Sequence, residues 1–291
     1  MKEYMKAFIY PNLEKAHSLE CTNEVIKILS SLDCSIVMQP QLSGIINCSG
    51  AQFADVHEGV GCSDVVITIG GDGTILKIAS EAARAGKKLL GINCGRLGFM
   101  ASLERSELTE LSKLVLGDYK TESRMMLDVT IDRTSGAGDI ICATALNDIV
   151  ITHGFKYNIN DFTVLADGVK VSSLRADGLI FSTPTGASAY SLSAGGPLIE
   201  PSMDCIEFTQ ICPHSLFART MIFSPEKNIE VKFKAVGEIG ISADGNKVIP
   251  VSAKDKICIR RSELRLDLID ISKNNYFRSI GSKLMQSAKE N

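Results

Sequence analysis

The chain has 291 residues, of which 45% are hydrophobic and 22% are charged, and its formal net charge is −3. This composition is typical of soluble globular proteins, and the length predicts about two domains. The charge gives no basic surplus for nucleic-acid binding, no apolar run approaches the roughly 20 residues of a membrane span, and the first residues lack the apolar core of a signal peptide.

The first 120 residues alternate between apolar strand-like runs and amphipathic helical stretches. In chain order we predict a strand at 6–10, a helix at 13–31, a strand at 34–39, an irregular segment at 40–63, a strand at 64–69, a helix at 74–85, a strand at 89–93 and a helix at 106–116. Such alternation favours a parallel sheet with helices packed on its faces. We therefore expect a Rossmann-like α/β domain over residues 1–122.

The texture changes after this domain, because short strand-like runs are now separated by turn signals such as SGAG, SPEK and ADGN. The predicted strands are 124–132, 139–152, 161–174, 178–182, 205–212, 219–223, 228–234, 238–243, 256–260 and 264–271. We expect a β-rich, β-sandwich-like domain over residues 123–272, with one helix at 187–194. The remaining segment, 273–291, is predicted to be a terminal helix.

Nine cysteines are distributed along the chain, none of them in C-x-x-C spacing. Most lie in apolar runs, which is typical of small core residues. We therefore predict reduced cysteines in a cytoplasmic protein. Without clustered ligands, a zinc site is not expected.

The most informative short motif is GGDGT at residues 70–74, between a predicted strand and the following helix. Ligands of open α/β sheets bind at this edge of the sheet. Glycines allow a phosphate to approach the backbone closely, and the helix N-terminus attracts anions. The alternative interpretation is a tight turn that binds nothing.

An acid within this turn needs its own explanation, since the carboxylate of Asp72 would repel a phosphate. Asp72 could help to hold Mg²⁺ between phosphates, or it could accept the proton of an alcohol that attacks phosphorus. The chain has neither GxxxxGK[ST] nor the G-x-G-x-x-G dinucleotide pattern. The motif therefore indicates a kinase whose acceptor is a hydroxyl group.

Several motifs, taken together, resemble those of the NAD kinase family. They are GGDGT (70–74), NCGRLGFM (93–100), Asn147-Asp148, DGLIFSTPTGASAYSLSAGGPLIEP (177–201), ICPHSLFAR (211–219) and the late Asp-Gly turn at 242–245. Diacylglycerol and sphingosine kinases share GGDGT, and phosphofructokinases have it as GGDGS, but these proteins do not share the 177–201 stretch. That stretch is therefore the most specific part of the resemblance.

The resemblance implies transfer of the γ-phosphoryl group of ATP, or a phosphoryl group of polyphosphate, to the 2′-hydroxyl of the adenosine ribose of NAD. It implies Mg²⁺ or another divalent cation, held through the phosphates and not by a dedicated set of protein ligands. It also implies an active site in the cleft between two domains, a chain end that packs back on the first domain, and a homodimer or homotetramer. Small-molecule nucleotides are then the partners, with no nucleic acid or membrane.

The family's site residues can be carried over position by position. Asp72 becomes the catalytic carboxylate, and the phosphate turn consists of Gly70, Gly71 and Thr74. The nucleotide-binding residues are then Gly73, Phe99, Asn147, Asp148, Arg175, Asp177, Ser188, Ala189, Tyr190 and Ser193.

Some of these positions have a plain structural alternative. Asp72 could cap the following helix, Asn147 and Asp148 could form an ordinary turn, and Phe99 could be a core residue. Aspartate at 148 is one methylene shorter than the family's glutamate, and Ser188 replaces a threonine but keeps the hydroxyl.

Two other functions fit part of the pattern. A lipid or sphingoid-base kinase would share the GGDGT turn but would need an apolar acceptor cleft. A non-catalytic nucleotide sensor would share the fold, but Asp72 and Asn147 are both present, so nothing indicates lost chemistry.

Overall fold

A computed structural model describes residues 4–95, 98–133, 139–153, 159–215, 218–234, 238–271 and 280–281. The chain forms two compact units, one of Met1–Ser123 with Leu266–Asn291 and the other of Arg124–Arg265. Two long strands, β7 (Lys120–Asp132) and β18 (Lys256–Asp270), begin in one unit and end in the other. Within the described part of the chain, every helix is too short or too polar to cross a membrane.

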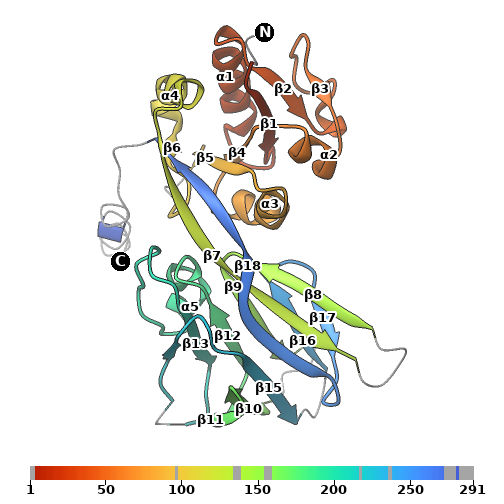
Figure 1. The fold of residues 1–291 in the computed structure, drawn as a ribbon, viewed down its shortest axis with the longest axis vertical. Helices are drawn as coiled ribbons and strands as arrows, with labels where there is room; N and C mark the ends of the chain where they lie inside the picture. The colour runs from red at the N-terminus through yellow and green to blue at the C-terminus, as the bar shows by residue number, and fades with distance from the viewer. Residues whose placement is uncertain are drawn as a thin grey trace. The chain divides into compact units, whose positions relative to one another are not determined.

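The first unit is an alternation of strands and helices (Figure 1). Its elements are β1 (Lys6–Pro11), α1 (Ser18–Ser31), β2 (Ser35–Met38), the 3₁₀ helix η1 (Pro40–Leu42), β3 (Gln52–Phe53), α2 (Val56–Gly61), β4 (Val65–Gly70), α3 (Asp72–Arg84), β5 (Lys88–Asn93), β6 (Leu103–Glu104), the 3₁₀ helix η2 (Arg105–Glu110) and α4 (Leu111–Leu116).

The strands of this unit pair in the order β5–β4–β1–β2–β3, and each of these pairs is parallel. The predicted parallel sheet is confirmed. In the β4–β5 ladder Gly70 is opposite Asn93, so the two glycine-containing turns that follow these strands start side by side. The sheet thereby brings together two motifs that are more than twenty residues apart in the sequence.

Helices cover both faces of the sheet. On one face, α1 and α4 pack on alternate strand residues, for example Ile9 and Ile67. On the other face, Gly59 of α2 lies against Phe8, and Ile75 of α3 lies against Gly91. All six residues of β4 are buried, as expected for a central strand between two helical layers.

In its described residues, the second unit consists of strands with two short helical segments. Its elements are β8 (Ile140–Ala145), β9 (Asp148–His153), β10 (Asn160–Ala166), β11 (Val169–Ala176), β12 (Gly178–Ser182), the 3₁₀ helix η3 (Gly186–Ser188), α5 (Tyr190–Ser193), β13 (Ile206–Ile211), β14 (Met221–Phe223), β15 (Ile229–Lys234), β16 (Ile239–Ala243) and β17 (Ile249–Val251).

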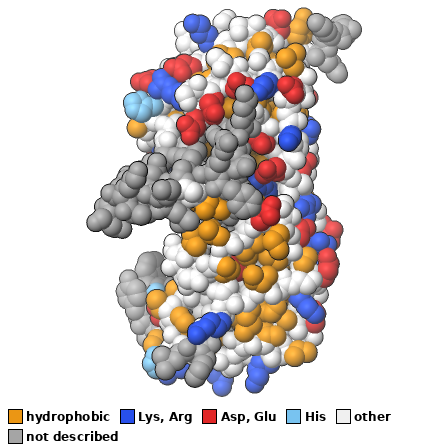
Figure 2. Space-filling model, turned by 90° about the vertical axis from the view of Figure 1, so that its left-hand side faces the viewer, with side chains coloured by type: hydrophobic (Ala, Val, Ile, Leu, Met, Phe, Trp, Pro, Cys, Tyr) orange, Lys and Arg blue, Asp and Glu red, His pale blue; other side chains and the backbone are white. Residues whose placement is uncertain are grey.

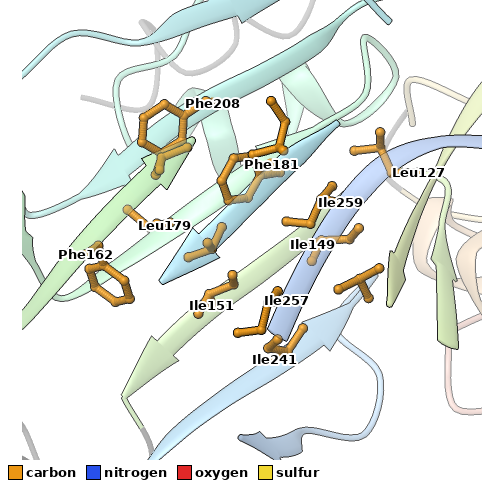
Figure 3. Packing of buried hydrophobic residues seen from close by; sticks show 14 of the residues in the cluster. Leu127, Ile149, Ile151, Phe162, Leu179, Phe181, Phe208, Ile241, Ile257 and Ile259 are labelled. Atoms are coloured by element: carbon orange, nitrogen blue, oxygen red, sulfur yellow. The ribbon is translucent and has the colours of Figure 1, made fainter. Parts of the chain in front are cut away.

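These strands form two layers. One has the order β14–β13–β12–β9–β16–β17, and the other contains β11–β10–β15–β18 with the β7–β8 pair. Buried side chains of both layers meet in one core, where Phe181 and Phe208 stack with ring centroids 5.1 Å apart (Figure 3). The expected β-rich, sandwich-like second domain is therefore confirmed.

Several predicted strands have different bounds in the structure. The run 139–152 is two strands, because the chain turns between β8 and β9. The run 161–174 is a hairpin that turns at Asp167 and Gly168, both of which have positive φ. The runs 256–260 and 264–271 form the single strand β18. This strand starts in the second unit, and its residues from Leu266 onward belong to the first unit.

The predicted 74–85 helix is present as α3, the predicted 13–31 helix begins only at Ser18, and two other predicted helices are divided in the structure. Residues 106–110 of the expected 106–116 helix belong to the 3₁₀ helix η2, and the expected 187–194 helix is η3 followed by the four residues of α5. The predicted terminal helix lies outside the described residues except for Ile280 and Gly281, which are helical.

Candidate active site

The GGDGT turn is a close-packed connection between β4 and α3. Gly71 has an extended backbone and precedes the first helical residue, Asp72. Gly71 N–H donates to the Thr74 hydroxyl (3.4 Å), and Thr74 N–H donates to the Gly71 carbonyl (2.8 Å). A Cβ on Gly70 would overlap the Thr74 hydroxyl, so only glycine fits there. The hydrogen bonds of Thr74 therefore fix the turn, while Gly73 is exposed.

The carboxylate of Asp72 does not point freely into solvent, because the second glycine turn holds it. One oxygen accepts the main-chain N–H of Phe99 (2.7 Å) and the other accepts that of Met100 (3.2 Å). A Cβ on Gly98 would overlap this carboxylate. Gly98, Phe99 and Met100 thus form a cradle for Asp72, and the contact of Phe99 needs only its main chain.

In the second unit, a half-buried aspartate organises the residues at the start of β9. Asp244 accepts three consecutive main-chain N–H groups, from Leu146 (2.7 Å), Asn147 (2.7 Å) and Asp148 (3.2 Å). Its own N–H donates to the Asp148 carbonyl (2.9 Å). Asp244 has a left-handed backbone (φ 52°), which aspartate tolerates better than most residues. These bonds explain why the strand breaks before β9.

Burial perturbs both acids of this cluster. Asp148 is 6% exposed, and burial together with the charge of Asp244 raises the pKa of Asp148 to about 7. Burial also raises the pKa of Asp244 to about 6, although its three N–H donors act in the opposite direction. Two acids with raised pKa values side by side are typical of a functional site.

The TPTG turn, residues 183–186, packs directly on the Asn147 backbone. The Asn147 carbonyl accepts the Thr183 N–H (2.8 Å) and the Ser182 hydroxyl (3.2 Å). A Cβ on Gly186 would overlap that carbonyl. The side-chain oxygen of Asn147, in contrast, is buried and has no partner among the described residues. An unsatisfied buried acceptor next to a buried acid is suited to bind hydroxyl groups of a ligand.

The SAY segment, Ser188-Ala189-Tyr190, follows this turn after one residue, Ala187. Ser188 ends η3 and donates its hydroxyl to the Thr185 carbonyl (3.3 Å). Tyr190 and Ser193 of α5 are exposed, Tyr190 by 45% of its surface, while Ala189 is half-buried. The tyrosine ring is therefore available to cover an aromatic ligand.

Comparison with known proteins agrees with this geometry. Residues 8–119 match the family model described as ATP-NAD kinase N-terminal domain, and residues 146–271 match the one described as ATP-NAD kinase C-terminal domain. A protein of Moorella thermoacetica named NAD kinase is 36% identical over 94% of this chain and 88% of its own length. The chain belongs to the NAD kinase family. An NAD kinase of Erwinia tasmaniensis is 35% identical over 92% of each chain.

Two solved structures have the same fold as this NAD kinase family member. Yeast NADH kinase complexed with NADH superimposes with a TM-score of 0.86 at 24% identity, over 97% of this chain and 87% of that one. An NAD kinase from Archaeoglobus fulgidus in complex with ATP has a TM-score of 0.75 at 25% identity, over 97% and 99%. The alternative function, a lipid or sphingoid-base kinase, is not supported.

The structure does not bring every predicted NAD-binding residue together. Asp177 precedes β12, whereas Ser182 and the TPTG turn end it, so the five residues of β12 separate them by about 17 Å. Arg175 forms an exposed pair with Asp161 (Nε–Oδ1 3.3 Å). Both line a recess of about 510 Å³ whose remaining walls are Thr163, Ser173, Leu174, Lys232, Phe233 and Lys234.

One organising residue of this NAD kinase site was missed among the predicted site residues. Asp244 was noted only as part of a late Asp-Gly turn, although it binds the backbone of the predicted ribose-binding pair. Nothing local in ADG distinguishes it from the Asp167-Gly168 turn, which joins β10 and β11. Across the described residues, no cluster of three histidine, cysteine or acidic side chains is arranged to hold a metal ion.

Proposed function

We propose that this member of the NAD kinase family transfers the γ-phosphoryl group of ATP to the 2′-hydroxyl of the adenosine ribose of NAD, with Asp72 as the catalytic base. The observation that carries this assignment is the fixed carboxylate, held by Phe99 N–H at 2.7 Å and Met100 N–H at 3.2 Å. Each carboxylate oxygen has a second lone pair, so Asp72 can still accept a hydroxyl proton. Its orientation is set before the substrate arrives, which favours reaction.

The proposed step is balanced within the two substrates and Asp72. The 2′ oxygen of the ribose forms a bond to the γ-phosphorus, and the bond from that phosphorus to the β–γ bridging oxygen breaks. ADP leaves with the electron pair of that bond, and the hydroxyl proton passes to Asp72. General-base assistance of this kind typically contributes about 10²–10⁴-fold to the rate.

We assign the phosphates to the N–H groups of the GGDGT turn. Gly73 is exposed in the first turn of α3, a helix of 13 residues, and helix N-termini favour anions. Gly70 and Gly71 let a phosphate approach the backbone, and the Thr74 hydroxyl fixes the turn by accepting the Gly71 N–H. The acid in this turn then serves the acceptor hydroxyl, while the backbone serves the phosphates.

We assign the ribose to Asn147 and Asp148 and the base to the SAY segment. The unpartnered Asn147 oxygen and the adjacent Asp148 carboxylate can bind the 3′-hydroxyl, which leaves the proton of the 2′-hydroxyl to Asp72. Ser188, Ala189, Tyr190 and Ser193 would contact the adenine, and Phe99 would form a wall of the nucleotide site. Arg175 and Asp177 would contact a different part of the nucleotide, because β12 separates them from Asn147.

A divalent cation, Mg²⁺ in the first place, would be bound chiefly by phosphate oxygens. Phosphate oxygens are hard ligands of the kind that suits Mg²⁺. The cation would neutralise charge on the transferred phosphoryl group. Chelation with EDTA is expected to abolish NADP formation and leave binding of NAD detectable by calorimetry, and unchanged turnover in EDTA would contradict a cation requirement.

We also propose a homodimer or homotetramer in the cytoplasm. Hydrophobic side chains gather on the second unit's surface in one view (Figure 2), and the exposed large hydrophobic residues of that unit include Ile140, Met203, Ile222 and Val248. All nine cysteines are free thiols, which suits a reducing compartment. Light scattering after gel filtration and cell fractionation test the two statements, and a monomer or a membrane-fraction protein would contradict them.

The decisive experiment incubates the purified protein with ATP, Mg²⁺ and NAD and measures NADP with an NADP-specific dehydrogenase. Parallel reactions contain polyphosphate in place of ATP, NADH in place of NAD, and sphingosine or diacylglycerol as acceptor. NADP formation with ATP supports the proposal. Binding of NAD without turnover would indicate a sensor and would overturn it.

A further inference from the structure

A cluster of buried polar side chains in the second unit takes no part in the roles assigned above. Ser191 of α5 and Glu207 and Thr209 of β13 belong to it, and the half-buried Thr220 just before β14 adjoins it. Ser191 and Glu207 are fully buried, and Thr209 is 1% exposed. An acid this deep in a domain is costly unless hydrogen bonds compensate it, so its presence calls for a role.

The hydroxyl groups of the cluster converge on one oxygen of Glu207. Ser191 Oγ lies 2.7 Å and Thr209 Oγ1 lies 3.2 Å from Glu207 Oε1, and Thr209 and Thr220 lie 3.0 Å apart. Ser191 Oγ is also 2.9 Å from Thr209 Oγ1, but the single hydroxyl proton favours the shorter bond to the carboxyl. The other carboxyl oxygen, Oε2, has no partner among the described residues.

The backbone after α5 is shaped to accept this junction. Gly196 N–H donates to the Ser191 carbonyl (2.8 Å), and a Cβ on Gly196 would overlap both Glu207 Oε1 and the Ser191 hydroxyl. Burial raises the pKa of the Glu207 carboxyl, while the Ser191 and Thr209 hydrogen bonds oppose that rise. The Glu207 side chain, which belongs to β13, is therefore enclosed by α5 and by the segment that follows α5.

The element held by this contact cannot hold itself in place. α5 has only four residues and no side-chain cap at its N-terminus. Helices this short have no stability of their own, so tertiary contacts decide where α5 lies. The same turn that buries Ser191 exposes Tyr190 and Ser193, two of the residues assigned to the nucleotide.

We propose that Glu207 is a positioning residue of the nucleotide site, which holds α5 through Ser191 and so places Tyr190 and Ser193 for NAD. This inference rests on the proposed function of α5 and adds a residue that does not touch the substrate. Loss of the Glu207 acceptor removes the shorter bond of Ser191 and leaves α5 only the Ser191–Thr209 contact, and the cost appears in NAD binding and not in the chemical step.

The test compares Glu207→Leu and Glu207→Gln with the same two changes at Glu263, an exposed residue of β18. Leucine removes both acceptors, whereas glutamine keeps one side-chain oxygen for Ser191 and Thr209. We expect Glu207→Leu to raise the KM for NAD about tenfold, as for the loss of a hydrogen bond to a charged group. We expect kcat and the KM for ATP to stay within about twofold, and Glu207→Gln to restore most of the NAD affinity.

Ser191→Ala carries the test if Glu207→Leu does not fold, because it removes the same bond from the other side; it should also raise the KM for NAD. An unchanged KM for NAD in Glu207→Leu or Ser191→Ala, with only a lower melting temperature, would overturn the inference. Tyr190→Ala separates the two proposals. If it raises the KM for NAD and the Glu207 and Ser191 variants do not, only the positioning role is wrong; if none does, the assignment of α5 to the nucleotide is wrong as well.

Discussion

The carboxylate of Asp72 accepts the main-chain N–H of Phe99 at 2.7 Å, although the two residues are 27 positions apart in the sequence. This bond connects the turn after β4 to the turn after β5, which the parallel sheet places side by side. It means that the second glycine motif acts on Asp72 through its backbone. The proposed catalytic role of Asp72 therefore depends on residues that carry no reactive side chain.

Replacing Asp72 with asparagine should remove the proton acceptor and keep the side-chain size. We expect kcat to fall about 10²–10⁴-fold, with the KM for NAD changed much less. The measurement is the rate of NADP formation at saturating ATP and NAD. Activity within a factor of ten of the wild type would exclude Asp72 as the base.

Gly98→Ala tests the cradle without touching the carboxylate. The new Cβ would overlap the Asp72 oxygens, so the second turn or Asp72 must shift. A misplacement of this size is expected to lower kcat about tenfold to a hundredfold and to leave NAD binding nearly unchanged. Gly95→Ala is the matched control, since a Cβ there meets nothing within 4 Å. Equal kcat values for the two variants would show that the cradle does not position Asp72.

Asn147→Ala tests the unpartnered side-chain oxygen. Because this oxygen bonds to no described residue, its loss should lower the free energy of unfolding only slightly, by at most about 1 kcal/mol. The Kd for NAD should rise about tenfold if the oxygen accepts a ribose hydroxyl. Calorimetric titration with NAD measures this, with Asn228→Ala as an exposed control. A Kd equal to that of the control would remove Asn147 from the ribose site.

The buried acids predict an unusual dependence of stability on pH. The folded pKa values of Asp148 and Asp244, about 7 and about 6, lie above the ordinary value of roughly 3.9. Between about pH 4 and 7 the folded state therefore binds more protons than the unfolded state, so these groups stabilise the fold at low pH and lose that effect as the pH rises. Asp148→Asn should remove part of this loss.

Chemical unfolding at pH 5 and pH 8 measures that effect. In the wild type, the free energy of unfolding should be lower at pH 8 than at pH 5. In Asp148→Asn this decrease should be smaller, by an amount on the order of a few kcal/mol. Asp139→Asn changes an exposed acid of the same unit and should keep the wild-type difference. The same difference in the free energy of unfolding in all three proteins would mean that burial does not raise the pKa of Asp148 in the folded state.

Much of the architecture could be predicted because local patterns decide it. The alternation of apolar strands and amphipathic helices before residue 120, and the short strands after it, specify the two kinds of domain. GGDGT marks the turn after β4 because glycine alone tolerates the contact of Gly70 with Thr74. Element bounds were less accurate where tertiary bonds override propensity, as at Asn147, where Asp244 interrupts a long strand-like run.

The sequence by itself determined most of the elements, the glycine turn after β4 and the chemical identity of Asp72, because glycine conformation, hydrophobic periodicity and side-chain type are local properties. Only the tertiary structure decided which backbone holds Asp72, that Asp244 organises Asn147 and Asp148, and that β12 separates Asp177 from them. These relationships join residues from distant parts of the chain. Strand order and register create them, and no pattern within one segment encodes either.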